Sequence, residues 1–98
     1  SEVWTRKYDG KRIGDIDASI VTDHMMLAAA SLGLDTLWIC MFKPEAVREE
    51  FGLPDTVEPV NILLIGYGAD APASPDRHAT LRKPLEETVF YERFGQKR

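Results

Sequence analysis

The fold is decided by residues 18–40, ASIVTDHMMLAAASLGLDTLWIC, in which a helical pattern passes into a short apolar run. Apolar side chains recur at the spacing of one helix face at Val21, Met25, Ala28 and Leu32. Apolar neighbours widen this face until the last two turns are apolar nearly all round. Because a helix that is apolar on every side must be covered on every side, the pattern predicts a long buried helix.

The ends of this helix are also marked in the sequence. Asp15 or Asp17 can accept hydrogen bonds from the free N–H groups of a first turn, and Gly33 can adopt the left-handed conformation that ends a helix. A chain of 98 residues can hardly wrap such a helix alone. We therefore expect a second subunit to cover part of it, and predict a homo-oligomer, most simply a dimer.

Two short apolar runs predict strands, with a helix between them. Residues 36–42 (TLWICMF) and 60–67 (VNILLIGY) are too short and too continuous for amphipathic helices. The second run indicates a central strand that is covered on both faces. Pro44 can begin the intervening helix, and Gly52 followed by Pro54 can end it.

The remaining segments are less regular. Residues 1–14 form an irregular lead-in, with a short strand expected at residues 3–5, and residues 68–79 form a polar loop. Residues 85–94 predict a short helical turn followed by an extended tail. The order of elements is typical of an α/β or α+β domain.

Composition excludes several classes of function. Twelve Lys and Arg residues against 16 Asp and Glu residues give a net charge of −4, which disfavours a nucleic-acid-binding protein. The single cysteine, Cys40, excludes an internal disulfide and a cysteine-rich zinc site. The sequence has no apolar run of about 18 residues, so we expect no membrane span. With no targeting pattern visible, we expect a cytoplasmic protein.

Three groups of residues are candidates for a binding site, and each has a plainer alternative. Cationic side chains that could hold an anion, or simply face solvent, are Arg77, His78, Arg82 and Lys83. Gly66-Tyr67-Gly68 could let the backbone approach a ligand, or could merely end a strand. Soft and aromatic side chains that could line a flavin pocket, or fill the core, are Met25, Met26, Trp38 and Met41.

Two reactive residue types lack a supporting environment in the sequence. Cys40 lies within the first apolar run, which favours a buried, inert thiol over a nucleophile. His24 lies on the long helix beside Asp23, and a core or surface histidine is the favoured interpretation. No acid–base pair emerges from spacing alone.

Four segments, in order, resemble the C-terminal half of the nitroreductase family of flavin mononucleotide (FMN) enzymes. They are the helix and strand ASIVTDHMMLAAASLGLDTLWIC, the short helix FKPEAVREEFGLP, the strand and turn PVNILLIGYG, and the closing stretch DRHATLRKPLEETVFYE. Together they cover residues 15–92. The resemblance implies a three-layer α+β homodimer, with a long buried helix on a small sheet and an extended C-terminal arm at residues 87–94 that embraces the other subunit.

The resemblance also implies an activity. In this family FMN bound at the subunit interface accepts a hydride from NAD(P)H and passes electrons to nitroaromatics, quinones or similar small aromatic acceptors. The cofactor carries the redox chemistry, so no acid–base pair is required of the protein.

Individual positions match the family's cofactor-binding residues. Cys40 and Met41 match strand-end positions whose backbone N–H groups face the flavin N5/O4 edge, with Trp38 just before them. Gly66, Tyr67 and Gly68 match the turn near the flavin. The basic pair that grips the FMN phosphate matches Arg82 and Lys83, with Arg77 a weaker candidate.

The family's N-terminal half, with its phosphate-binding R-x-S-x-R-type segment, has no counterpart in this sequence. We therefore expect residues 1–98 to form a single partial domain, truncated relative to a full enzyme. Two alternatives remain open, namely a non-catalytic dimerising remnant without cofactor and a small anion-binding module.

Overall fold

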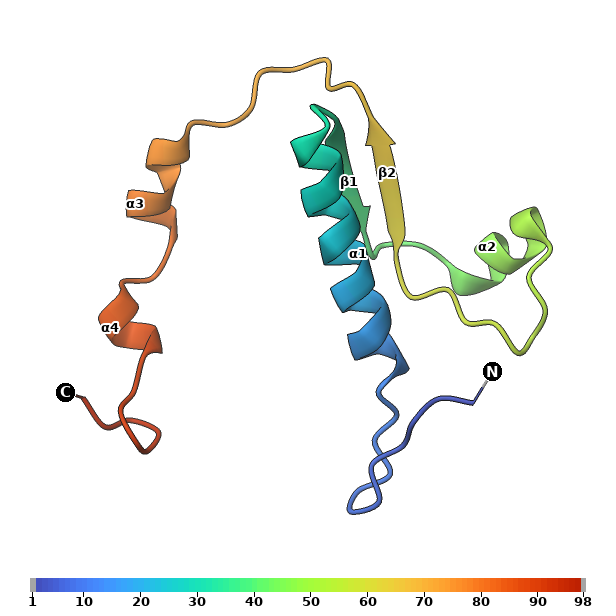
Figure 1. The fold of residues 1–98 in the computed structure, drawn as a ribbon, viewed down its shortest axis with the longest axis horizontal. Coiled ribbons are helices and arrows are strands. Elements are labelled where there is room, and N and C mark those ends of the chain that lie inside the picture. Colours follow the sequence, from blue (N-terminus) through green and yellow to red (C-terminus); the bar gives the residue numbers. More distant parts are fainter. Residues whose placement is uncertain (1, 98) are drawn as a thin grey trace.

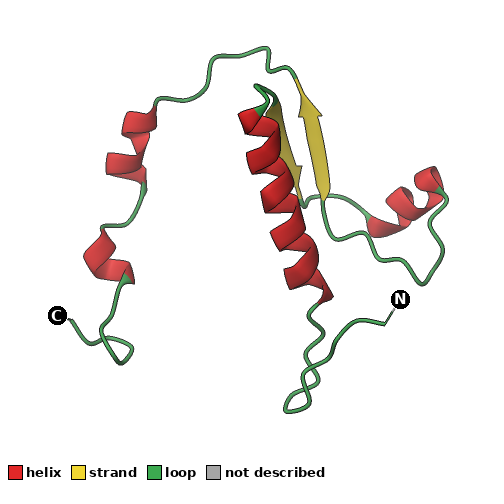
Figure 2. Cartoon of the chain, in the orientation of Figure 1, coloured by secondary structure: helices red, strands yellow, loops and turns green. Residues whose placement is uncertain are grey.

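A helix on a two-stranded sheet forms the body of the chain, as Figures 1 and 2 show. The structure is a computed structural model that describes residues 2–97. Its elements, in chain order, are α1 (Gly14–Ser31), β1 (Asp35–Ile39), α2 (Pro44–Phe51), β2 (Ile62–Gly66), the 3-10 turn η1 (Pro75–Arg77), α3 (His78–Leu81) and α4 (Leu85–Thr88). Helices beside a small antiparallel sheet confirm the expected α+β class. No helix of the described residues is both long enough and apolar enough to cross a membrane.

β1 and β2 pair antiparallel over their whole length. The register runs from Asp35 opposite Gly66 to Ile39 opposite Ile62. Each strand is five residues long, and so is shorter than the apolar run that predicted it. The prediction of a central strand covered on both faces is wrong for this chain, because β2 has a single neighbouring strand among residues 2–97 and its second half is exposed.

α1 packs on β1 with its small side chains. Thr22 and Ala29, two helical turns apart, are the buried residues of this helix. Val21 and Met25, on the apolar face expected to be covered, are about half exposed at 58% and 48%. The helix is therefore not buried within this chain, and several of its bulky side chains are exposed.

A polar contact fixes the same face of α1 near the start of β2. The Thr22 hydroxyl oxygen lies 2.9 Å from the Ala18 carbonyl oxygen and 3.0 Å from Oδ1 of Asn61. Since a hydroxyl has one hydrogen, it can donate to one of these oxygens at a time, and Asn61 can instead donate to it through its amide nitrogen if the amide is turned over. Either arrangement satisfies the one buried polar side chain of the described residues.

Glycines end both longer helices as predicted. Gly33 follows α1 with φ of +78°, and Gly52 caps α2 with φ of +64°. Pro44 begins α2, also as predicted. The start of α1 differs from the prediction, because Ile13 occupies the N-cap, and Asp15 and Asp17 lie inside the first turn, where they favour the helix through its dipole rather than through a cap hydrogen bond.

The residues before α1 form a turned-back loop. An isolated bridge pairs Thr5 with Arg12, and Gly10 turns the chain with φ of +71°. An ion pair between Arg6 and Asp9 lies at the turn. The Arg6 guanidinium, with the Lys11 N–H, lowers the pKa of the Asp9 carboxyl, and Asp9 in turn raises the pKa of Arg6.

Residues 67–97, called the arm below, contact the start of β1 at Gly68, and beyond this point the arm runs apart from α1 and the sheet (Figure 1). In the arm, α3 packs against η1, whereas the extensive contacts of the body join β1 with β2 and α1 with β1. The radius of gyration is 18.4 Å, against about 13 Å for a compact domain of this length. The described chain is thus an open arrangement with little core of its own.

The end of the arm folds back on itself. The predicted helical turn is present as α4, but the chain beyond it does not stay extended. The Phe90 and Phe94 rings meet edge to face at 4.8 Å, and Lys97 Nζ lies 4.6 Å from the centre of the Phe90 ring. Lys97 also donates a hydrogen bond to the Glu86 carbonyl.

The face of α1 that meets the sheet can be tested by overpacking. Ala29 is 5% exposed, so Ala29→Leu should destabilise the fold by about 1–3 kcal/mol, because the added methylenes have no space. Ala30→Leu is the matched control, since Ala30 is exposed and should tolerate the change. Urea unfolding followed by far-ultraviolet circular dichroism measures both, and equal losses would mean that α1 meets the sheet with another face.

Candidate functional site

The first group of candidate residues lies where β1 ends. Trp38 is half-buried in the strand, and its indole Nε1 donates a hydrogen bond to Cys40 Sγ at 3.1 Å. Cys40 lies one residue beyond the strand and is exposed, so the prediction of a buried mid-strand thiol is wrong for this chain. Met41 is 95% exposed, and its backbone N–H finds no acceptor among residues 2–97.

Trp38 also forms one wall of an open groove between β1 and α1. The groove has a volume of about 650 Å³, and its other lining residues are Asp15, Ile16, Ser19, Ile20, Asp23 and His24. Its lining combines two isoleucine side chains and the indole with the carboxylates of Asp15 and Asp23. His24 has no hydrogen bond or ion pair to another described side chain, so it forms no acid–base pair within residues 2–97.

The second group, Gly66-Tyr67-Gly68, lies at the opposite end of the sheet. Antiparallel pairing puts Gly66 beside Asp35, at the start of β1, whereas Cys40 and Met41 follow its end. At a rise of about 3.4 Å per residue, five-residue strands separate these ends by roughly 14 Å. Tyr67 is 89% exposed.

Gly68 approaches a carboxylate closely. Its N–H donates a hydrogen bond to Asp35 Oδ2 at 2.7 Å, and a Cβ added at this position would lie 2.5 Å from the same oxygen. β2 ends at Gly66, so the motif ends a strand, as one of its two interpretations expected. The close approach at Gly68 is to a side chain of the same protein, which neither interpretation anticipated. Asp35 was not a candidate in the sequence, because its partner lies 33 residues away and no local pattern links the two.

The third group, on the arm, divides into paired and unpaired cations. Arg77 Nη1 donates to the carbonyl oxygens of Ala73 and Ser74 at 3.0 and 2.8 Å, so this guanidinium closes its own turn. Arg82 and Lys83 follow α3, are exposed, and make no side-chain hydrogen bond or ion pair within the described chain. Of the four cationic residues considered in the sequence, Arg77 is occupied by its own turn, and Arg82 and Lys83 remain as an adjacent unpaired pair. His78 is half-buried at the first position of α3.

The chain by itself does not bring these three groups together. Two of them occupy opposite ends of the sheet, and the third lies on the arm, apart from the sheet and α1 (Figure 1). A ligand contacting all three needs the arm to lie closer to the sheet, or a surface supplied by other residues.

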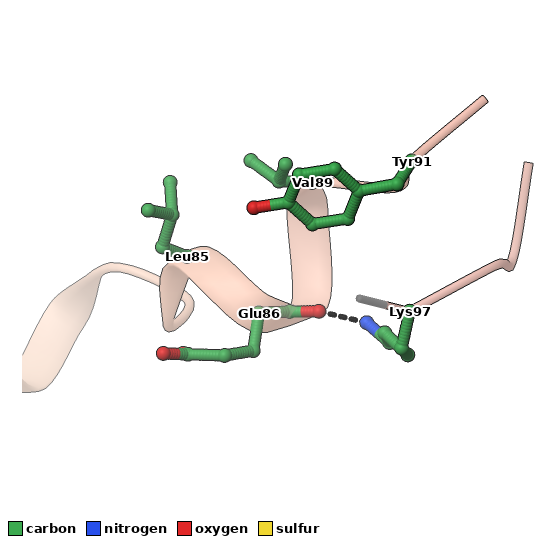
Figure 3. A pocket seen from close by; sticks show the side chains of 5 residues that line it. All are labelled: Leu85, Glu86, Val89, Tyr91 and Lys97. Atoms are coloured by element: carbon green, nitrogen blue, oxygen red, sulfur yellow. Dashed lines mark hydrogen bonds between the residues drawn. The ribbon is translucent and has the colours of Figure 1, made fainter.

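The arm has a hollow of its own near its end. Leu85, Val89 and Tyr91 form its apolar wall, and Lys97 reaches across to the Glu86 carbonyl (Figure 3). Its volume is about 430 Å³. No group of three or more His, Cys, Asp or Glu side chains in residues 2–97 is arranged to hold a metal ion.

Comparisons with known proteins agree with the resemblance drawn from the four segments. The sequence model of the nitroreductase family matches residues 3–67. The crystal structure of a nitroreductase family protein from Clostridium difficile 630 is similar over 93% of this chain, with 59% identity and a TM-score of 0.86. The open arrangement of body and arm is therefore one that a larger family member shares.

Two curated archaeal proteins are also similar, and both are named as candidate NADH dehydrogenases/NAD(P)H nitroreductases. The one from Methanothermobacter thermautotrophicus is 34% identical over 72% of this chain, and the one from Archaeoglobus fulgidus is 31% identical over 55% of it. The chain spans 39% and 33% of the lengths of these relatives, and 53% of the crystallised chain.

The exposure of Cys40 can be measured directly. Because Cys40 is exposed, its thiol should react with Ellman's reagent in the folded chain. One equivalent of thionitrobenzoate per chain should be released without denaturant. Denatured protein gives the reference rate for full accessibility. A native rate more than about a hundredfold slower would contradict the exposed placement, since it would require an opening of the structure costing roughly 2.7 kcal/mol.

Proposed function

We propose, because the chain belongs to the nitroreductase family, that it acts as part of an FMN-dependent NAD(P)H oxidoreductase whose acceptors are nitroaromatics, quinones or similar small aromatic molecules. Family membership supports an oxidoreductase in general. The cofactor, the nicotinamide donor and the acceptors are the finer content of the proposal, and the residues below are assigned to them on their chemistry.

The observation that carries the proposal is the unpaired cation pair on the arm. Arg82 and Lys83 are adjacent and exposed, whereas Arg77, five residues before Arg82, is occupied by carbonyl groups. A phosphate ester needs charge-assisted donors that are free to converge on it, and a guanidinium beside an ammonium supplies them. We assign the FMN phosphate to this pair.

The end of β1 offers a backbone N–H donor for the flavin ring, in addition to the cations assigned to the phosphate. The Met41 N–H has no acceptor within the described chain, and Met41 directly follows Cys40, whose thiol accepts the Trp38 indole N–H. Backbone N–H groups directed at a ring edge stabilise negative charge that develops there. We assign Cys40 and Met41 to the ring edge, with Trp38 as an apolar wall.

The residues of this chain bind and orient, and the cofactor supplies the redox chemistry. When bound, FMN takes up a hydride from NAD(P)H and delivers electrons to the acceptor. We assign Gly66, Tyr67 and Gly68 to the turn near the flavin, at the point where the chain passes from the sheet into the arm. No side chain of the chain is assigned a proton-transfer role.

The exposed face of α1 supports assembly. Ile20 and Leu27 are 52% and 63% exposed on α1, and Leu32, which caps the C-terminal end of the helix, is 77% exposed. Exposed apolar surface of this extent is typical of an interface. We propose that a second copy of the chain covers α1 in a homodimer.

The cofactor assignment predicts a phosphate-specific effect. Purified chain titrated with FMN should show the visible absorption bands of a bound flavin, and the double variant R82A/K83A should bind FMN roughly 10- to 100-fold more weakly, because two charge-assisted contacts are lost. Binding of riboflavin, which lacks the phosphate, should be unchanged. Flavin fluorescence quenching measures both affinities.

A matched variant separates placement from net charge. Arg93→Ala removes one positive charge from the same arm, at a residue not assigned to the cofactor, and should leave FMN affinity within about twofold. A chain that takes up no FMN would overturn the proposal and favour the non-catalytic dimerising alternative. An equal loss for riboflavin would place the cations away from the phosphate.

The assembly proposal has its own test. Light scattering coupled to size exclusion should give twice the chain mass at micromolar concentration. Leu27→Glu should weaken the dimer at least tenfold, because it would bury an unpaired carboxylate in the interface. Glu49→Gln on α2, at an exposed residue outside the proposed interface, is the control. A monomeric unsubstituted chain would contradict the proposal.

A further inference from the structure

We propose that Asp35 is a positioning residue for the cofactor phosphate, because its carboxylate fixes the point at which the arm leaves the sheet. This inference rests on the proposed function, since it assumes that Arg82 and Lys83 on the arm bind the FMN phosphate. The geometry that supports it lies at the last residue pair of the sheet.

The carboxylate reaches past the end of the strand pairing. Asp35 is paired with Gly66, the last residue of β2, and its Oδ2 accepts the N–H of Gly68, two residues farther along, at 2.7 Å. A charged acceptor makes this bond stronger than a bond between neutral groups. The first residues of the arm are thereby held against the start of β1.

The glycine is required by this contact rather than by its backbone angles. Gly68 is not among the glycines of positive φ, so an alanine could adopt its conformation. Its Cβ, however, would lie 2.5 Å from Asp35 Oδ2 and 3.1 Å from Asp35 Cγ, which would push the carboxylate away. The hydrogen bond from Gly68 to Asp35 therefore depends on the absence of a side chain at residue 68.

This bond is the arm's main tie to the body. Among the described residues, no other hydrogen bond joins residues 67–90 to residues 2–66. Other hydrogen bonds of that stretch stay within the arm, such as those that close η1. On this proposal, the direction of the chain at Gly68 sets the course of the loop to α3, and so the position of Arg82 and Lys83.

Charge and position predict opposite results at Asp35. Removing a carboxylate makes the protein less negative, which by Coulomb's law should favour an anionic phosphate slightly. Releasing the arm should instead weaken phosphate binding, because Arg82 and Lys83 then sample many orientations. A weaker affinity for FMN in Asp35→Ala would thus identify the effect of position rather than of charge.

The experiment compares FMN with riboflavin in three forms of the full chain. Asp35→Ala should bind FMN on the order of 5- to 10-fold more weakly than the unsubstituted chain, with riboflavin unchanged. Asp35→Asn, whose amide oxygen can still accept the Gly68 N–H, should restore FMN affinity to within about twofold. Asp70→Ala is the matched control, since Asp70 is an exposed loop residue that makes no side-chain hydrogen bond or ion pair within residues 2–97.

A second readout needs no cofactor. Amide hydrogen exchange at Gly68 should be at least fivefold faster in Asp35→Ala than in the unsubstituted chain or Asp35→Asn. Unchanged FMN affinity in Asp35→Ala, or an equal loss for riboflavin, would overturn the inference. Failure of the proposed function looks different, because the unsubstituted chain would then bind no FMN while the exchange at Gly68 still responded to Asp35.

Discussion

The packing of α1 on β1 is the constraint on which the rest of the structure depends. The helix meets the sheet through Thr22 and Ala29, so little apolar surface is removed from water in this contact. Hydrophobic stabilisation grows with the apolar area buried, at about 25 cal/mol per Å². A helix and two strands with so small a shared surface need further surface to stabilise them, and the bulky exposed side chains of α1 provide it.

The same economy of contact explains why the candidate residues stand apart. Because β1 and β2 pair antiparallel, their C-terminal ends lie at opposite ends of the sheet. The arm then leaves beside Asp35, at the edge away from Cys40 and Met41 (Figure 1). Within residues 2–97 the two ends of the sheet and the arm therefore form no common site, and the chain spans 53% of its crystallised relative.

What the sequence predicted well was local. Gly33 and Gly52 end their helices because a left-handed residue needs no tertiary partner, and Pro44 begins α2 for a similar reason. Which face of α1 meets the sheet, and whether Cys40 is covered, depend on contacts between distant segments. The Asp35–Gly68 bond, across 33 residues, left no periodic or spacing signal at all.

The two faces of α1 also resolve why its sequence appears apolar all round. Small residues such as Ala29 let the helix approach β1 closely, since the distance between packed elements follows the size of the side chains between them. Larger ones such as Ile20 and Leu27 lie on other faces of the helix and stay exposed. Periodicity counts all of these residues as apolar, but within this chain the position around the helix decides which are covered: Ala29 is buried and Met26 half-buried, whereas Leu27 is exposed.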